Sequence, residues 1–183
     1  METKRLFISL PVDPMLSKDI IKKFSNLNLP WEKLKKANLE QMHLTLKFLG
    51  DFPIDKIPDL LNSLSRIDIG ISDLELEINQ SEIFNIQQPK VLALAIKKNN
   101  DLQKLYDEID QVLFDDGLSH KEVRRFSAHL TLARVKQKAD FEEFEEFNNW
   151  QIKKSFFVSY FELKESELTK AGSEYTTLQV FDL

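Results

Sequence analysis

The 183-residue chain contains no cysteine, so disulfides, thiolate metal sites and cysteine nucleophiles are excluded, and a reducing cytoplasm is its expected location. It has only four glycines and no G-x-x-x-x-G-K-[ST] loop, which argues against ATP-dependent chemistry. The net charge of −5 argues against a protein that coats long stretches of phosphate backbone, because such binding depends on many lysines and arginines. Apolar runs such as VLALAI at 91–96 are far shorter than a membrane span. We therefore expect a soluble protein without membrane attachment.

Two series of strands and helices follow one another in the same order. Alternating apolar residues predict strands, and apolar residues at helical spacing predict helices; Asp13 before Pro14 has the form of a helix N-cap, and Gly117 that of a helix stop. With 42% hydrophobic residues, the chain can fill one core. We expect a single domain, 1–183, with an internal repeat of roughly 1–85 and 90–183, and hence two similar lobes. The predicted elements are a strand at 5–10, a helix at 13–26, a strand at 42–49, a helix at 53–64 and a strand at 73–80, then a strand at 90–97, a helix at 99–117, a strand at 128–135, a short helix at 141–150 and strands at 155–166 and 174–181.

The tetrapeptide HLTL occurs at 43–46 and again at 129–132, and these two copies use two of the three histidines in the chain. Side chains at positions i and i+2 of a strand share a face, so each histidine lies beside its threonine while the two leucines point to the other face. We expect the leucines to anchor each strand in its lobe. If the two motif strands face each other across a cleft between the lobes, two imidazoles and two hydroxyls form a cup.

Two imidazoles on either side of one substrate can act as base and acid together, because imidazole titrates near neutrality. Threonine hydroxyls can donate hydrogen bonds to the oxygens of a phosphate. Acyl transfer is not expected, since the chain has neither a G-x-S-x-G turn nor a cysteine. A metal site is the competing use of paired histidines, but there is no HExxH motif and His120 is the only third imidazole. Phosphate-ester chemistry without metal or cofactor is the function that these residues predict.

Basic residues gather around the second motif. Six of them, against the single acid Glu122, lie between positions 121 and 138, although the whole chain is acidic. Such a run is often only a solvated face, but this one brackets a candidate site and indicates a small anionic ligand. The six are Lys121, Arg124, Arg125, Arg134, Lys136 and Lys138.

Two HxTx motifs about half a chain apart resemble those of the 2H phosphoesterase superfamily, and in particular the RNA 2′,3′-cyclic phosphodiesterases, also called 2′-5′ RNA ligases. The similarity extends to RLFISLPVD at the start, to KFLG and LAR beside the motifs, and to the final segment. It implies an α+β fold of two pseudo-symmetric lobes, each an antiparallel sheet with outer helices, and an active site in the cleft between them.

By the same resemblance His43 and His129 are catalytic, and Thr45 and Thr131 bind phosphate. Phe48 resembles a base-stacking residue and Arg134 a phosphate or ribose contact, with Tyr175 and Arg125 as possible accessory contacts. Three positions depart from the pattern of similar proteins, which often have a proline, a tryptophan and an aromatic residue there: Ala128, Lys36 and Ala93.

Strict alternation of side chains between the two faces of a strand conflicts with the roles of two of these residues. Phe48 falls on the same strand face as Leu44 and Leu46, so it can equally be a core residue. Arg134 falls on the face opposite to His129, so a role in the site requires a bend in the strand. Lys47 shares the face of His43, but a lysine at the end of a strand is expected to be solvated.

The resemblance implies hydrolysis of RNA ends that carry a 2′,3′-cyclic phosphate to 2′-phosphomonoesters, with His129 as base and His43 as acid. Three alternatives remain open: 2′-5′ ligation by the reverse reaction, hydrolysis of a small cyclic nucleotide or an ADP-ribose cyclic phosphate, and a non-catalytic module that binds RNA ends. The expected partners are RNA ends or short oligonucleotides with a 2′,3′-cyclic phosphate, and the expected state is a monomer.

Overall fold

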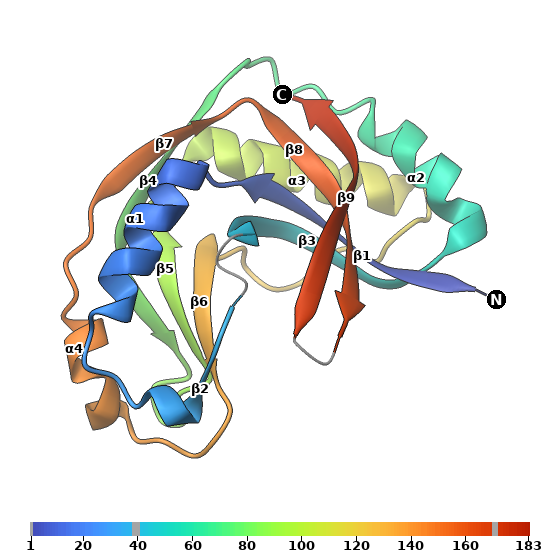
Figure 1. Ribbon diagram of the computed structural model, residues 1–183. Helices are drawn as coiled ribbons and strands as arrows, with labels where there is room; N and C mark the ends of the chain where they lie inside the picture. Colours follow the sequence, from blue (N-terminus) through green and yellow to red (C-terminus); the bar gives the residue numbers. More distant parts are fainter. Residues whose placement is uncertain (1, 38–40, 170–171) are drawn as a thin grey trace.

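A computed structural model describes residues 2–37, 41–169 and 172–183. Its described strands form one antiparallel, nine-stranded sheet in the order β7-β4-β5-β6-β3-β1-β8-β9, with β2 paired to β6 (Figure 1). The sheet curls strongly, which gives the molecule its curved outline. The strands are β1 (Thr3–Pro11), β2 (Leu34–Lys36), β3 (His43–Pro53), β4 (Leu74–Phe84), β5 (Val91–Ile96), β6 (His129–Val135), β7 (Lys154–Val158), β8 (Tyr160–Leu168) and β9 (Ser173–Asp182).

Two of the helices begin and end where the sequence signals indicate. Asp13 caps α1 (Pro14–Ser25), since its carboxylate accepts the Leu16 N–H at 2.8 Å, and Asn99 caps α3 (Asn100–Asp115) in the same way. Gly117, with a φ of 68°, follows the end of α3 in the left-handed conformation that glycine favours. The other helical segments are α2 (Ile57–Leu64), α4 (Glu145–Asn148) and the 3-10 turns η1 (Trp31–Lys33), η3 (Ile54–Lys56) and η4 (Phe141–Phe144).

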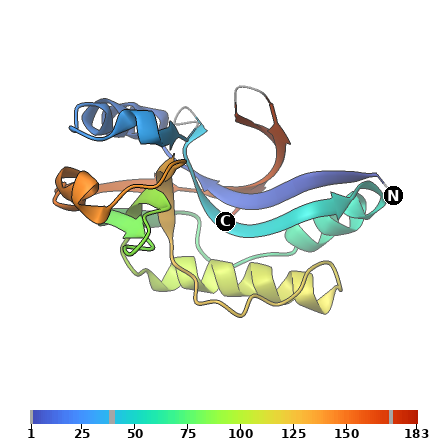
Figure 2. The same cartoon turned by 90° about the horizontal axis from the view of Figure 1, so that it is seen from below.

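The helices lie on both sides of the curled sheet. Figure 2 shows α3 on one side, with the β8–β9 hairpin curling away on the other. The helix α2 packs against α3, whereas α1 packs against α4 through the Phe24 ring, which lies 5.8 Å from that of Phe147. Among the described residues, no helix combines the length and the apolar character needed to cross a membrane.

The α+β fold with antiparallel strands and outer helices is confirmed, and the two lobes correspond to two half-sheets. We call β3, β1, β8 and β9 the β3 half-sheet, and β6, β5, β4 and β7 the β6 half-sheet. The half-sheets do not follow the halves of the chain, because β4 pairs with β5 and β8 pairs with β1. The chain therefore exchanges strands between the lobes, and the internal repeat of roughly 1–85 and 90–183 stays a prediction.

The motif strands are arranged differently from the expectation that they face each other across a cleft. They are neighbours in the sheet, and Leu44 of β3 pairs with Leu130 of β6. This pair joins the two half-sheets, so the junction of the lobes lies at the motifs themselves. Further along the same edge, β6 pairs with β2 instead of β3.

Candidate active site

The antiparallel pairing of β3 with β6 brings the two HLTL motifs side by side. With Leu44 opposite Leu130, the register places His43 beside Thr131 and Thr45 beside His129. Both leucines are fully buried, while the four polar side chains are half-buried on the other face. The polar side chains line a cavity of about 410 Å³ together with Phe48 and Arg134. All six residues predicted from the sequence therefore meet at one place.

The two imidazoles are held in the same way. Nδ1 of His43 lies 2.8 Å from the Gln41 carbonyl oxygen, and Nδ1 of His129 lies 2.8 Å from the Ser127 carbonyl oxygen. A carbonyl can only accept, so each Nδ1 carries the proton and donates it. Nε2 is then the nitrogen of each ring that is free to take or give a proton at a ligand.

Aromatic side chains lie against both imidazoles. The His43 ring centroid lies 5.0 Å from that of Phe7 and 5.1 Å from that of Tyr175. The His129 ring lies 4.7 Å from Phe84. Burial is the main reason that the pKa of His43 is lowered from its ordinary value of 6.5, and the bond to the Gln41 carbonyl acts in the opposite direction. His43 therefore loses its proton more readily than an exposed histidine does.

Equivalent β-bulges lie at the last residue of each motif. In β3, Thr45 pairs with Ser9 and Lys47 with Ile8, so Leu46 is the extra residue. In β6, Thr131 pairs with Ala93 and Ala133 with Leu92, which makes Leu132 the extra residue. An extra residue reverses the alternation of all side chains after it.

The bulges decide where Phe48 and Arg134 lie. Phe48 is 62% exposed and lines the cavity, so the core alternative for this residue is wrong. Arg134 reaches the same cavity because the bulge provides the bend that its role requires. The two residues come from opposite ends of the paired motifs.

Simple alternation is wrong for Lys47 as well as for Phe48 and Arg134. Lys47 was expected to be solvated, but the bulge turns it inward, and only 8% of it is exposed. Its ammonium group donates to the carboxylate of Asp110 in α3 at 2.5 Å and to the His120 carbonyl oxygen at 3.1 Å. Strand β3 is thus tied to α3 and to the loop that leads to the second motif.

Of the accessory residues, the structure brings Tyr175 to the cavity but not Arg125. Two hydrogen bonds between Gln41 and the backbone of Tyr175 hold the β8–β9 hairpin beside His43. Arg125 lines a separate cavity, and of the six basic residues between 121 and 138 only Arg134 lines the site. Gln41, Phe84 and Lys35 also belong to the site region but carried no recognisable signal in the sequence.

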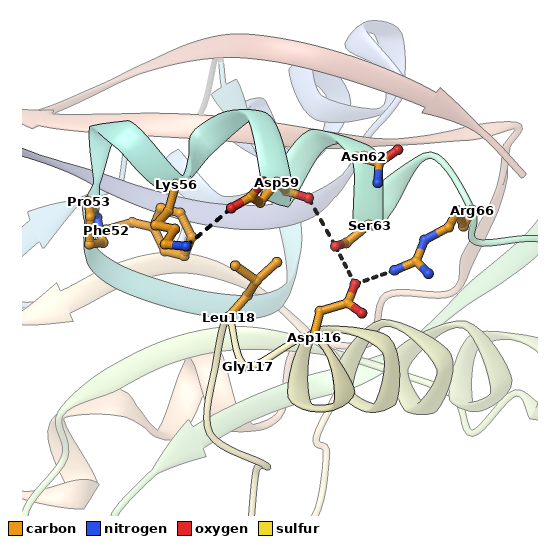
Figure 3. Close-up of a pocket in the computed structure, with 10 residues that line it drawn as sticks. All are labelled: Phe52, Pro53, Lys56, Asp59, Asn62, Ser63, Arg66, Asp116, Gly117 and Leu118. Atoms are coloured by element: carbon orange, nitrogen blue, oxygen red, sulfur yellow. Dashed lines mark hydrogen bonds and ion pairs between the residues drawn. The ribbon is translucent and has the colours of Figure 1, made fainter.

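Another cavity, of about 420 Å³, lies between α2 and the end of α3, away from the motifs (Figure 3). Its charged groups are paired with one another, since Asp116 accepts from Ser63 and Arg66, and Lys56 lies 3.3 Å from Asp59. It contains no histidine. In the described part of the chain, no three His, Asp or Glu side chains are grouped closely enough to hold a metal ion.

The chain is similar in sequence to known proteins over most of its length. Residues 10–92 match the family model described as LigT like Phosphoesterase. A protein of Thermotoga maritima named RNA 2′,3′-cyclic phosphodiesterase is 30% identical over 182 residues, which cover 95% of this chain and 92% of the relative. The chain belongs to the LigT-like phosphoesterase family. A second member with the same name, from Archaeoglobus fulgidus, is 29% identical over 97% of this chain and 99% of its own length.

Solved structures of the family share the fold. A crystal structure of a phosphoesterase is similar with a TM-score of 0.81 at 21% identity, covering 100% of this chain and 99% of that one. The E. coli LigT protein in complex with 3′-AMP has a TM-score of 0.80 at 21% identity, with the same coverage. The LigT-like phosphoesterase fold thus extends over the whole chain.

Proposed function

We propose that this LigT-like phosphoesterase hydrolyses RNA ends that carry a 2′,3′-cyclic phosphate and releases a 2′-phosphomonoester. The observation that carries the proposal is the matched pair of imidazoles, each with Nδ1 bound to a carbonyl oxygen and Nε2 free, on neighbouring strands of one cavity. The names of the Thermotoga and Archaeoglobus relatives support the same substrate.

In the proposed reaction, His129 is the base and His43 the acid. Nε2 of His129 takes a proton from water as the water oxygen bonds to phosphorus. The bond between phosphorus and the 3′ oxygen breaks, and His43 gives its Nε2 proton to that oxygen. Burial lowers the pKa of His43, which disfavours the protonated form that the acid role requires. The negative charge of the phosphate favours the protonated form before the reaction.

Thr45 and Thr131 complete the proposed site by donating hydrogen bonds to the non-bridging phosphate oxygens. Each threonine lies beside the histidine of the other motif, so the phosphate meets one hydroxyl and one imidazole from each strand. Phe48 stacks on the terminal base, and Arg134 neutralises negative charge on the phosphate. These groups all come from one chain, so the proposed site is complete without a second copy.

A short RNA with a 2′,3′-cyclic phosphate tests the proposal when the product is identified by phosphorus NMR. We expect a 2′-phosphomonoester. A 3′-phosphate would reverse the proposed orientation of the substrate, and a 2′-5′ linkage to added 5′-hydroxyl RNA would indicate ligation. Binding without conversion would identify a non-catalytic module instead.

A further inference from the structure

A segment without helix or strand, residues 116–128, connects α3 to the second motif. In Figure 2 it runs back along α3 toward β6. Among the described residues, no hydrogen bond between two backbone groups involves positions 120–127. The segment nevertheless ends in a group of the site, because the Ser127 carbonyl oxygen accepts the bond from Nδ1 of His129. Other contacts must therefore hold that carbonyl in place.

Two side chains of α3 hold this segment against the helix. The Asp110 carboxylate accepts the Glu122 N–H at 3.1 Å. The Tyr106 ring stacks on the Phe126 ring, with 4.2 Å between the centroids and 13° between the planes. Tyr106 and Asp110 are four residues apart, so they lie on the same face of α3, and both are buried. Between the two attachments the chain is open to solvent, since Val123 is 97% exposed.

The stacked pair is the attachment nearest to His129. Phe126 directly precedes Ser127, and on the other side the Ala128 carbonyl oxygen accepts the Ile96 N–H at 2.9 Å. The peptide unit that joins Ser127 to Ala128 is planar, so contacts on both of its flanks fix the direction of the Ser127 carbonyl. Phe126 supplies the contact on one flank, and β5 supplies the contact on the other.

The first motif has the same arrangement with a different support. Gln41 precedes His43 by two residues, as Ser127 precedes His129, and its carbonyl oxygen is the partner of Nδ1. The Gln41 side chain forms two hydrogen bonds with the backbone of Tyr175. These contacts come from the β8–β9 hairpin and not from α3. His43 is therefore an internal reference for any change that is made at the stacked pair.

We propose that Tyr106 and Phe126 are positioning residues for His129, because their stacked rings hold the Ser127 carbonyl oxygen where it accepts from Nδ1. This inference rests on the function proposed above. With the carbonyl in place the proton stays on Nδ1, and Nε2 is left unprotonated, as a base requires. Without it the imidazole can take the other tautomer, in which Nε2 carries the proton and cannot accept one. Neither ring lines the cavity, so both act through this backbone group.

The first test follows the tautomer of His129 by nitrogen-15 NMR of histidine-labelled protein at about pH 8.5, where an ordinary imidazole is neutral. In the wild type we expect His43 and His129 to carry the proton on Nδ1. Phe126→Leu, which removes the stacked ring but keeps an apolar side chain, should shift His129 to a mixture of tautomers and leave His43 unchanged. Tyr106→Phe keeps both rings and should retain the wild-type spectrum. The signals are assigned by their absence from His43→Gln and His129→Gln.

The second test measures turnover of RNA 2′,3′-cyclic phosphate. Phe126→Leu should lower kcat about 10–100-fold with KM nearly unchanged, because a displaced base slows the reaction while the groups that bind the substrate stay in place. Tyr106→Leu should have the same effect, and the double variant should lose little more than either single one, since both remove one contact. The matched control is Phe141→Leu, the same substitution at another half-buried phenylalanine, in η4. It should keep both kcat and the tautomer.

An unchanged His129 tautomer, or an unchanged kcat, in folded Phe126→Leu would overturn the inference. An equal loss in Phe141→Leu or an equal change at His43 would also overturn it, because either would indicate a general loosening of the fold. If the wild type does not cleave the cyclic phosphate, the proposed function is wrong. The NMR comparison, which needs no activity, then decides by itself whether the stacked pair holds His129.

Discussion

Phe48 and Arg134 occupy equivalent positions in the two copies of the motif, each five residues after the histidine and each turned to the cavity by a bulge at the second leucine. The backbone is thus repeated while the side chains differ. Phe7 packs against Phe48, with ring centres 5.7 Å apart, and Lys35 lies opposite Arg134. One end of a pseudo-symmetric cavity is therefore aromatic and the other basic, so the two ends of the cavity differ chemically.

Removal of the Phe48 ring should weaken binding of the terminal base. Stacking of a base on an aromatic side chain contributes about 1–3 kcal/mol, so Phe48→Ala should raise KM by roughly 5–150-fold with a smaller change in kcat. Phe48→Tyr, which keeps the ring, is the control and should retain the wild-type KM. Because Phe48 is 62% exposed, neither change should alter unfolding. An unchanged KM in Phe48→Ala would remove this residue from the substrate site.

The buried pair of Lys47 and Asp110 should be sensitive to the loss of one partner. The side chains are only 7% and 6% exposed, and Lys47→Met leaves the Asp110 carboxylate buried without its cation. The free energy of unfolding in urea should fall by about 3–5 kcal/mol. The control is Lys97→Met, which breaks the exposed pair of Lys97 with Glu77 and should leave the free energy of unfolding nearly unchanged. Equal losses in the two variants would contradict the structural role of the buried pair.

His43 should make stability depend on pH. Its pKa in the folded protein lies below the ordinary 6.5, so the unfolded chain binds more protons in the interval between the two values. The stabilisation is fully present above 6.5 and is lost as the pH falls through the lower folded pKa. Unfolding free energies between about pH 5 and 8 should therefore drop toward acid in the wild type and drop less in His43→Gln. Parallel curves for the two proteins would disprove the lowered pKa.

Chelation should leave activity unchanged. The proposed mechanism obtains its acid and base from the two imidazoles and its phosphate-binding groups from the two threonines. Turnover of the cyclic phosphate is measured before and after dialysis against EDTA, with an added zinc salt as the second arm. Loss of activity in EDTA with recovery in zinc would replace the two-histidine mechanism by a metal-assisted one.

Most elements of the fold could be predicted from the sequence because their signals are local. The Asp13 cap with Pro14 and the apolar face of α3 depend only on residues near in the chain. The exchange of β4 and β8 between the half-sheets could not be predicted in this way. It depends on which strands pair over long range, and strand periodicity carries no information on the partner.

The candidate site was predictable as far as the repeated motif extends. His43, Thr45, His129 and Thr131 follow from duplication and strand alternation, and they do share one cavity. The bulges at Leu46 and Leu132, the last residues of the motifs, reverse the alternation that follows, so simple alternation places Lys47 on the wrong face. A bulge depends on pairing with the neighbouring strand, and the HLTL sequence itself does not predict it.

We propose that His43 and His129 act together as acid and base. This proposal is tested most directly by the turnover of RNA 2′,3′-cyclic phosphate in the wild type, in His43→Ala, in His129→Ala and in the double variant, with circular dichroism as the control for folding. Each single replacement should slow turnover by about 10²–10⁴-fold, and the double replacement should cost clearly less than the two single losses combined, because both groups act in one step. Near wild-type turnover in a folded single variant would contradict the claim and remove that histidine from the reaction.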